Sequence, residues 1–312
     1  MSQEQKIEEL LSRGVEEVID QAHLKERLLS GEKLHIKFGV DPTSPNLHIG
    51  RAVPLLKLKD FQELGHKITL IIGDFTAEIG DTSDKNAERQ MLTTDQVKKN
   101  LETYVEQAGK ILDLEKIEVR HNSDWLNDLS YKEVVKQANV FSVAEFIARK
   151  NIKKRLDEEK RISVRELLYP LMQGYDSVVL KNDVEVGGTD QRFNMLTGRK
   201  MQEMYEQEPQ DILTVSLILG TDGRKMSSSW GNTINLTDKP EDMFGKTMSI
   251  PDDLIISYFE NCTRVPMEQV KEYEKQLQDP NNNPRDLKMI LASEITGFYW
   301  GQDEAQKAQK HF

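Results

Sequence analysis

Apolar residues recur along the chain at two spacings, and the spacing separates helices from strands. Over residues 2–30 they lie three and four positions apart, which predicts an amphipathic helix. Residues 34–40 and 68–73 are short, almost continuous apolar runs, a pattern typical of strands buried on both faces of a sheet. Between these runs, helical spacing returns at about residues 47–64 and ends beside Gly65.

The alternation of strand and helix continues downstream and is then interrupted. The segments that continue it are a polar helix at 94–112 and strands at 117–120, 183–188 and 213–218. A charged helical stretch at about 120–165 separates the two groups of strands, and only helices and loops are expected after residue 239. Because strands that alternate with helices build parallel sheets, the pattern predicts an α/β fold with a doubly wound, Rossmann-like sheet.

These patterns divide the chain into three predicted parts. The parts are an N-terminal helical segment at 1–30, a sheet domain with its helical insertion at 31–222, and a loop with an all-helical C-terminal domain at 223–312.

Composition excludes several classes of protein. Of the 312 residues, 37% are hydrophobic and 30% are charged, the balance of a soluble globular protein. No apolar run approaches the roughly 20 residues that a membrane span needs, and the polar N-terminus is not a secretory signal. The single cysteine, Cys262, excludes a disulfide framework and a cysteine-rich metal site. We therefore expect a cytoplasmic protein without a membrane partner.

The net charge of −11 disfavours nonspecific binding to nucleic acid but leaves room for a local basic patch. The candidate is RKNIKKR at 149–155, followed by Lys160 and Arg161. The alternative is a solvated helix face, because acidic residues at 157–159 interleave with these cations.

A first candidate site follows the first apolar strand, in the sequence DPTSPNLHIGR at 41–51. Asn46 is placed to cap the next helix, whose free N–H groups would then form a site for phosphate. His48 would donate a hydrogen bond to a phosphate oxygen, and Gly50 would let a flat base lie against the backbone. The alternative is a histidine at a helix start without a role.

A second candidate site is the sequence GTDGRKMSSSWGN at 220–232, which follows the last predicted strand. A glycine-flanked loop of this kind can close on a triphosphate, with charge from Lys225 and donors from its serines. The alternative is an ordinary basic surface loop.

Three polar residues lie on one stripe of an otherwise apolar helix. Tyr169, Gln173 and Asp176 are spaced i, i+4 and i+7, so at about 100° per residue they face the same side. Such a stripe forms either a buried hydrogen-bond network or a pocket for a small amphipathic ligand.

Together these motifs resemble those of the class I aminoacyl-tRNA synthetases. HIGR at 48–51 and KMSSS at 225–229 resemble the HIGH and KMSKS signatures. Further segments resemble tyrosyl-tRNA synthetases in particular, in the order of that family: KFGVDPT at 37–43, GDFTAEIGD at 73–81, YPLMQGYD at 169–176 and VGGTDQ at 186–191. The resemblance covers roughly residues 30–312.

The resemblance implies a role for each matching residue. For L-tyrosine, Asp176 would accept a hydrogen bond from the substrate hydroxyl, and Lys37 stands where a residue reaches that hydroxyl. The ammonium group would be surrounded by Tyr169, Gln173 and Asp81, and Gln191 would hold the carboxyl group. For ATP, Gly39 and Asp41 would line the channel, Gly188 and Asp190 would hold the ribose, and Thr43, His48, Gly50, Arg51, Lys225, Met226, Ser227 and Ser228 would form the phosphate end.

The implied chemistry has two steps and needs no side-chain nucleophile. The tyrosine carboxylate attacks the α-phosphate of ATP, giving tyrosyl-adenylate and pyrophosphate, and the 3′ end of tRNA(Tyr) then takes the tyrosyl group. Mg²⁺ would accompany ATP, with no tightly bound cofactor or protein-held metal.

Lys85 and Arg89 match positions at the tRNA acceptor end, or are ordinary surface charges. A homodimer is usual in the family, and apolar residues in the insertion fit either its interface or a core: Val140, Phe141, Val143, Phe146 and Ile147.

The sequence departs from the family pattern at several places. Arg51 replaces the second histidine of HIGH, Ser228 replaces the second lysine of KMSKS, and Lys37 stands where one branch has tyrosine. Family members usually continue into an RNA-binding module similar to the S4 fold, whereas this sequence ends at Phe312. With that module absent, we expect adenylate formation to be intact and tRNA charging to be weak.

Three alternatives to tyrosine activation are considered at this point. A smaller nucleotidyltransferase would share the H-x-G site but would lack the helical tail and usually the amino-acid pocket. A tryptophanyl-tRNA synthetase shares the fold and both signatures, although the polar stripe on the 169–176 helix argues against it. A catalytically silent relative that binds RNA is kept open by Arg51 and Ser228.

Overall fold

A mixed six-stranded sheet forms the centre of the computed structural model, which describes residues 2–82 and 91–312. Over these residues the strands run in the order β1-β6-β5-β2-β3-β4. Their bounds are β1 Val15–Ile19, β2 His35–Val40, β3 Lys67–Ile72, β4 Ile117–His121, β5 Val184–Gly188 and β6 Asp211–Val215. Neighbouring strands are parallel except β1, which pairs antiparallel with β6 at one edge. The predicted α/β fold with a doubly wound sheet is confirmed.

The order of the strands creates a crevice between β2 and β5. From β2 the chain proceeds outward through β3 to β4, and from β5 it proceeds in the opposite direction to β6. In open α/β sheets, ligands bind at the carboxyl ends of the two strands where the order reverses. The loops that follow Val40 and Gly188 are therefore placed at this crevice.

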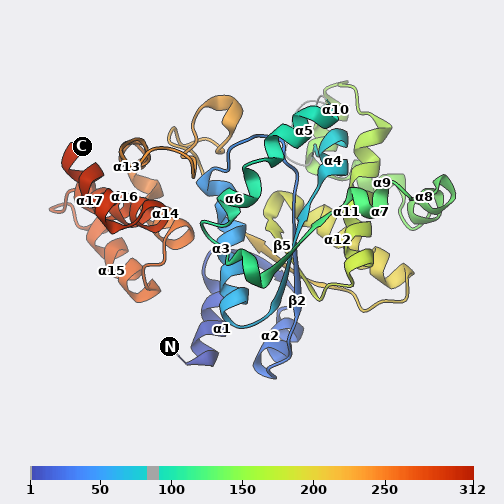
Figure 1. Cartoon of the computed structure of the whole chain (residues 1–312), viewed down its shortest axis with the longest axis horizontal. Coiled ribbons are helices and arrows are strands. Elements are labelled where there is room, and N and C mark those ends of the chain that lie inside the picture. Colours follow the sequence, from blue (N-terminus) through green and yellow to red (C-terminus); the bar gives the residue numbers. More distant parts are fainter. Residues whose placement is uncertain (1, 83–90) are drawn as a thin grey trace.

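Helices surround the sheet, as Figure 1 shows. Those of the first half are α1 Gln3–Ser12, α2 Gln21–Leu29, α3 Ile49–Glu63, α4 Asp74–Ile79, α5 Thr94–Leu101 and α6 Tyr104–Ala108. The insertion contains α7 Ser123–Leu126, α8 Tyr131–Ala138, α9 Val143–Ile147 and α10 Lys150–Asp157. Two longer helices, α11 Val164–Leu180 and α12 Arg192–Met204, flank β5 in the sequence.

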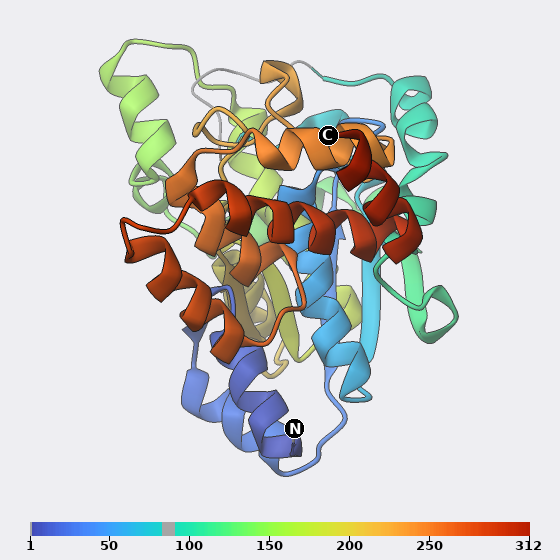
Figure 2. The same ribbon diagram turned by 90° about the vertical axis from the view of Figure 1, so that its left-hand side faces the viewer.

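The last part of the described chain is helical, as predicted. It contains α13 Pro240–Met248, α14 Ile255–Cys262, α15 Met267–Gln278, α16 Pro284–Trp300 and α17 Gln302–His311. Figure 2 shows these helices, in orange and red, lying across the side of the molecule that carries α3. In the described parts of the chain, no helix has the length and apolar character needed to cross a membrane.

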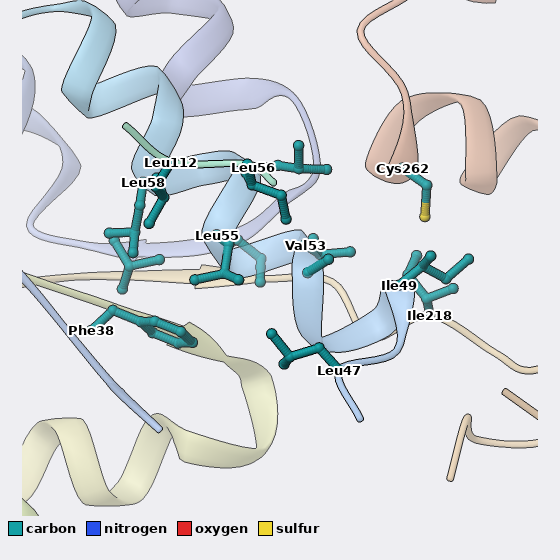
Figure 3. Packing of buried hydrophobic residues seen from close by; sticks show 14 of the residues in the cluster. Phe38, Leu47, Ile49, Val53, Leu55, Leu56, Leu58, Leu112, Ile218 and Cys262 are labelled. Carbon is teal, nitrogen blue, oxygen red and sulfur yellow. The ribbon is translucent and has the colours of Figure 1, made fainter. Parts of the chain in front are cut away.

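Helix α3 joins the sheet to the C-terminal helices through one continuous core. Leu55 and Leu58 of α3 point toward Phe38 of β2 (Figure 3). At the start of the same helix, Ile49 lies near Ile218 and on the side of Cys262 from α14. Burying apolar side chains of this size stabilises the fold by about 1.5–3 kcal/mol each. This packing holds the first turn of α3 in place beside the crevice.

Helices α11 and α12 approach each other closely at two glycines. A Cβ at Gly174 would lie 2.7 Å from Met201 Sδ, and one at Gly198 would lie 2.9 Å from Ser177 Oγ. Only hydrogen fits at these positions without displacing a neighbour. The close contact fixes the face of α11 that carries the predicted polar stripe.

The prediction of a continuous helix over 2–30 is wrong in its middle. The chain forms strand β1 there, between Gly14 at φ +62° and Asp20 at φ +62°, both in the left-handed region. Pairing with β6 decides this conformation, because the apolar positions of VEEVI suit either a helix or an edge strand. The helix predicted over 94–112 is also interrupted, between α5 and α6, and β6 ends at Val215 rather than at residue 218.

Candidate active site

The crevice receives the ends of several elements that are far apart in the sequence. Asp41 follows β2, Asp190 lies in a short 3-10 helix after β5, and Asp81 lies two residues after the end of α4. Helix α11 contributes Tyr169, whose hydroxyl donates to Asp41 Oδ2 at 2.8 Å. The polar stripe of α11 therefore faces the crevice rather than solvent.

His48 stands at one end of the crevice, at the start of α3. It is the N-cap residue by backbone geometry, but its side chain makes no capping hydrogen bond. The imidazole is 7% exposed, and its Nδ1 has no hydrogen-bond partner. Burial, together with the positive charges of Arg51 and Lys225, lowers the pKa of His48 to about 3. A neutral imidazole therefore faces this end of the crevice at neutral pH.

The prediction that Asn46 caps α3 is wrong. Asn46 is exposed and lies two residues before the cap position, which His48 occupies. Backbone pairing decides this start: Ile49 N–H donates to the carbonyl of Ile234, and Leu236 N–H donates to the carbonyl of Leu47. The helix start is held by the 232–236 segment rather than by a local cap.

The 225–229 loop meets the start of α3 in the folded chain. A Cβ on Gly50 would lie 3.3 Å from Met226 Sδ, so the absence of a side chain at position 50 allows this contact. Lys225 Nζ lies 3.3 Å from Asp190 Oδ2, and Arg51 donates to Thr43 Oγ1 at 3.1 Å. Two cations from distant segments thus flank the same end of the crevice.

The backbone of this loop is held, while its hydroxyl groups remain accessible. Ser227 N–H donates to Asn232 Oδ1 at 2.9 Å, and the amide of Asn232 donates to the carbonyl of Lys225 at 3.1 Å. The Ser227 and Ser229 hydroxyls lie 2.9 Å apart, and Ser228 is exposed. Several donors are therefore available to an anionic ligand at this place.

Asp176 lies buried at the other end of the site, with only 3% of its surface exposed. Its Oδ1 accepts from Trp125 Nε1 at 2.8 Å, and its Oδ2 accepts from Asn122 Nδ2 at 3.4 Å. Burial raises the pKa of Asp176 to about 7, against the lowering effects of Lys37 and of these two donors. A carboxylate with unused lone pairs in such surroundings is a strong acceptor for a hydroxyl group.

A chain of amide hydrogen bonds runs along the site between its two ends. Gln173 Oε1 accepts from Asn194 Nδ2 at 3.1 Å, and the same Nδ2 donates to Gln191 Oε1 at 3.0 Å. Gln191 Nε2 in turn donates to Asp81 Oδ2 at 2.8 Å. Each amide is thereby oriented by its neighbour, and Asp81 and Gln191 are brought together although 110 positions separate them.

Most of the predicted site residues gather around this crevice, and the positions of Lys85 and Arg89 lie outside the described residues. Gly39 lies in β2, two residues before Asp41, and Gly188 is the last residue of β5, two residues before Asp190. Lys37 is in β2 but is completely buried beneath α11.

The sequence prediction missed several residues that shape the site: Thr76, Asn122, Trp125, Glu185 and Asn194. Glu185 did carry a signal, since it is a lone acid within the apolar strand VEV and pairs in register with Lys37, a lone base in β2. Asn122 and Trp125 carried none, because a polar loop after a strand is usual and only the fold brings it to Asp176.

One group in the described part of the chain has the geometry to hold a metal ion, and it lies outside the crevice. Asp20, His23 and Asp211 offer ligand atoms within 4.8 Å of one another. Asp211 begins β6, at the end of the strand opposite to the crevice. Within the crevice itself, the carboxylates of Asp41 and Asp81 are instead hydrogen-bonded to Tyr169 and Gln191.

Comparison with known proteins identifies relatives over nearly the full chain. Residues 29–312 match the family described as tRNA synthetases class I (W and Y). The tyrosine–tRNA ligase of Thermotoga maritima is 50% identical over 304 residues, which cover 97% of this chain and 76% of that protein. A tyrosine–tRNA ligase of Dehalococcoides mccartyi is 47% identical over 310 residues, covering 99% of this chain and 78% of the relative.

Solved structures share the fold at low sequence identity. The tyrosyl-tRNA synthetase of Archaeoglobus fulgidus, solved in complex with L-tyrosine, superposes with a TM-score of 0.78 at 23% identity and covers 99% of this chain and all of its own. A truncated mitochondrial tyrosyl-tRNA synthetase of Coccidioides posadasii gives a TM-score of 0.77 at 24% identity, covering 98% of this chain and 91% of its own.

Proposed function

The chain belongs to the tyrosine–tRNA ligases among the class I tRNA synthetases, and from this premise we propose how its crevice activates L-tyrosine with ATP. The observation that carries the proposal is that the two ends of the crevice differ in charge. One end holds the buried acceptor Asp176, the other holds the cations Lys225 and Arg51, and Tyr169 lies between them. An amino acid with a phenol at one end and a reacting carboxyl group at the other fits this polarity.

Asp176 would accept the hydrogen bond of the substrate phenol. Phenylalanine would leave this buried carboxylate without that partner, which costs about 1–3 kcal/mol. Tyrosine is thereby preferred by hydrogen bonding, without a separate step that removes wrong products.

The α-amino and carboxyl groups of tyrosine would lie along the amide chain. Tyr169, Gln173 and Asp81 would surround the ammonium group, since they offer a phenolic oxygen, an amide oxygen and a carboxylate. Gln191, whose Nε2 already donates to Asp81, would orient the carboxyl group toward the nucleotide.

ATP would lie across the crevice with its phosphates toward α3. Gly39 and Asp41 would line the adenylate channel, and Gly188 and Asp190 would hold the ribose. The phosphate end would be formed by Thr43, His48, Gly50, Arg51, Lys225, Met226, Ser227 and Ser228. Mg²⁺ would enter with ATP as its substrate complex.

The chemical step needs orientation and charge stabilisation rather than a nucleophilic side chain. The tyrosine carboxylate displaces pyrophosphate from the α-phosphate in line, so the protein holds two reactants and stabilises the leaving group. Lys225 and Arg51 supply positive charge, and the neutral His48 supplies a hydrogen bond that a phosphate oxygen accepts.

The second step would transfer the tyrosyl group to the 3′ end of tRNA(Tyr). We expect Lys85 and Arg89 to contact the acceptor end, and we place the reaction in the cytoplasm, where tRNA and ATP are used together. The exposed apolar side chains of the insertion, Val143 and Ile147, would form a homodimer contact, whereas Phe146 belongs to a core with Phe193.

Pyrophosphate exchange tests the proposed activation. The protein, supplied with ATP, Mg²⁺ and radioactive pyrophosphate, should form labelled ATP when L-tyrosine is present and not when L-tryptophan replaces it. Exchange with tryptophan alone would indicate the related specificity, and exchange with neither amino acid would refute the proposal. The variant Lys225→Ala should lose most of the exchange while still binding tyrosine.

A further inference from the structure

A buried ion pair lies directly beneath the tyrosine end of the site. Lys37 of β2 and Glu185 of β5 are cross-strand neighbours at the point where the order of the strands reverses. Lys37 is completely buried and Glu185 is 2% exposed, and Nζ lies 3.1 Å from Oε1. Desolvating two charges is costly, and their attraction repays that cost only when further hydrogen bonds complete the pair.

Three acceptor groups of the protein surround the ammonium group of Lys37, two in hydrogen bonds and one in an ion pair. An ammonium group has three N–H donors. The Nζ of Lys37 lies 3.1 Å from the carbonyl oxygen of Gln173, 2.7 Å from Ser177 Oγ and 3.1 Å from Glu185 Oε1. Turning Nζ toward the substrate hydroxyl would therefore weaken these contacts with the protein.

These contacts fix the part of α11 that carries the site. Residues 173 and 177 lie on either side of Asp176, so Lys37 holds the backbone turn from which this carboxylate projects. The position of Asp176 beside Trp125 and Asn122 depends on this turn.

Glu185 fixes the orientation of the amide chain. Its Oε1 accepts from Gln173 Nε2 at 3.1 Å, and its Oε2 accepts from Gln210 Nε2 at 2.5 Å. Because the nitrogen of Gln173 is held by Glu185, its oxygen must face Asn194, and the orientation passes on to Gln191. An apolar residue at position 185 would leave the Gln173 amide free to turn over.

We propose that Lys37 and Glu185 are a positioning pair for tyrosine recognition, which orients Asp176 and Gln173 from below without touching the substrate. This inference rests on the proposed tyrosine activation and assigns Lys37 a different role from the direct contact that the family resemblance implies. Two apolar residues would fill the same space but would fix neither the turn of α11 nor the direction of the amide.

The two members of the pair act on Asp176 with opposite charge. The positive charge of Lys37 lowers the pKa of Asp176, and the negative charge of Glu185 raises it. The other groups that face Asp176 are the donors Trp125 and Asn122 and the hydroxyl-bearing Tyr169. Removing Lys37 should therefore raise the pKa of Asp176, and removing the charge of Glu185 should lower it.

The test compares Lys37→Met and Glu185→Gln with the control Glu166→Gln. The control breaks another buried ion pair of the same helix, Arg155 with Glu166, at its far end from Asp176. For each protein, KM for tyrosine, KM for ATP and kcat of pyrophosphate exchange are measured across pH, and thermal unfolding is recorded.

We expect both pair variants to raise KM for tyrosine about tenfold or more, as for the loss of a buried hydrogen-bond partner, with KM for ATP nearly unchanged. The pH midpoint of the tyrosine KM should move up in Lys37→Met and down in Glu185→Gln. The control should lower the unfolding temperature without either effect.

Three results would overturn the proposal. The first is an unchanged KM for tyrosine in both variants, and the second is that the pH midpoints of the tyrosine KM do not move apart. The third is an equal rise of KM for tyrosine and KM for ATP, as expected from a general loss of stability. If Lys37→Met does not fold, the test rests on Glu185→Gln alone. Its KM for tyrosine should rise relative to its KM for ATP, and the pH midpoint of the tyrosine KM should move down. Absence of tyrosine-dependent exchange in the unaltered protein would instead refute the proposed function itself, and the pair with it.

Discussion

Asp176 illustrates how burial sets the chemistry of a single side chain. An exposed aspartate titrates near pH 4, whereas burial raises the pKa of Asp176 to about 7 even though Lys37, Trp125 and Asn122 oppose the shift. The carboxylate is thus ionised for only part of the population at neutral pH, and its acceptor strength depends on pH.

Tyrosine binding should therefore depend on pH. As the pH falls through about 7, Asp176 takes up a proton and loses acceptor capacity, so KM for tyrosine should rise by about tenfold per pH unit below the midpoint. Steady-state exchange measured from about pH 6 to about pH 8 would show the change. The variant Asp176→Asn should give a pH-independent KM, and a flat profile in the unaltered protein would contradict the assignment.

The preference for tyrosine over phenylalanine should depend on the same residue. In Asp176→Ala no buried carboxylate is left unpaired when phenylalanine binds, so the ratio of the two kcat/KM values should fall by about one to two orders of magnitude. Tyr169→Phe is the matched control. The hydroxyl group of Tyr169 donates to Asp41, away from the phenol of the substrate, so kcat/KM should fall equally for tyrosine and phenylalanine. A ratio unchanged in Asp176→Ala would refute the role of this carboxylate.

At the scale of elements, the close contact of α11 with α12 decides which side chains reach the crevice. Gly198 lies against Ser177 and Gln210, both of which bind Glu185. The helices are thus held together by shape at the glycines and by hydrogen bonds next to them.

Replacing Gly198 by alanine should therefore destabilise the fold. The new Cβ would lie 2.8 Å from Gln210 Nε2 and 2.9 Å from Ser177 Oγ, and overpacking of this kind costs about 1–3 kcal/mol. Gly245→Ala in α13 is the control, since a Cβ there meets nothing within 4 Å. Because alanine has the higher helix propensity, the free energy of unfolding of this variant should rise by up to about 1 kcal/mol. Urea unfolding followed by circular dichroism measures both, and equal stability of the two variants would contradict this view of the contact.

At the scale of the whole molecule, the fold joins segments from both halves of the chain and leaves apolar side chains exposed on the insertion. Tyr131 of α8 is 84% exposed and Val143 of α9 is 65% exposed. Large exposed apolar side chains that gather on one part of a protein mark interaction surfaces. This placement supports the proposed homodimer through the insertion.

The charged variant Val143→Asp combined with Tyr131→Asp should dissociate that dimer, because a carboxylate cannot be buried in an apolar interface without a partner. Sedimentation velocity should show a dimer for the unaltered protein and a single chain for the variant. Leu29→Asp, an exposed apolar position on α2 at 47%, should leave the mass unchanged. A monomeric unaltered protein would contradict the interface.

The sequence predicted the parts of the protein that depend on local periodicity and on contiguous motifs. The apolar runs around Phe38 and Ile71 identified buried parallel strands, because a strand covered on both faces cannot contain many polar residues. The spacing of Tyr169, Gln173 and Asp176 placed them on one face of α11, since the helical repeat is independent of tertiary context.

The tertiary structure alone decided which of several locally acceptable states was formed and which distant groups met. Residues 15–19 became a strand because β6 offered an unpaired edge. Helix α3 began at Ile49, with His48 at the cap position, because the 232–236 segment pairs with this stretch of the chain. The partners of Asp176 and the pairing of Lys37 with Glu185 arise from contacts between separate elements. Local periodicity does not contain this information, because the free energy of a buried polar group depends on what the rest of the fold places beside it.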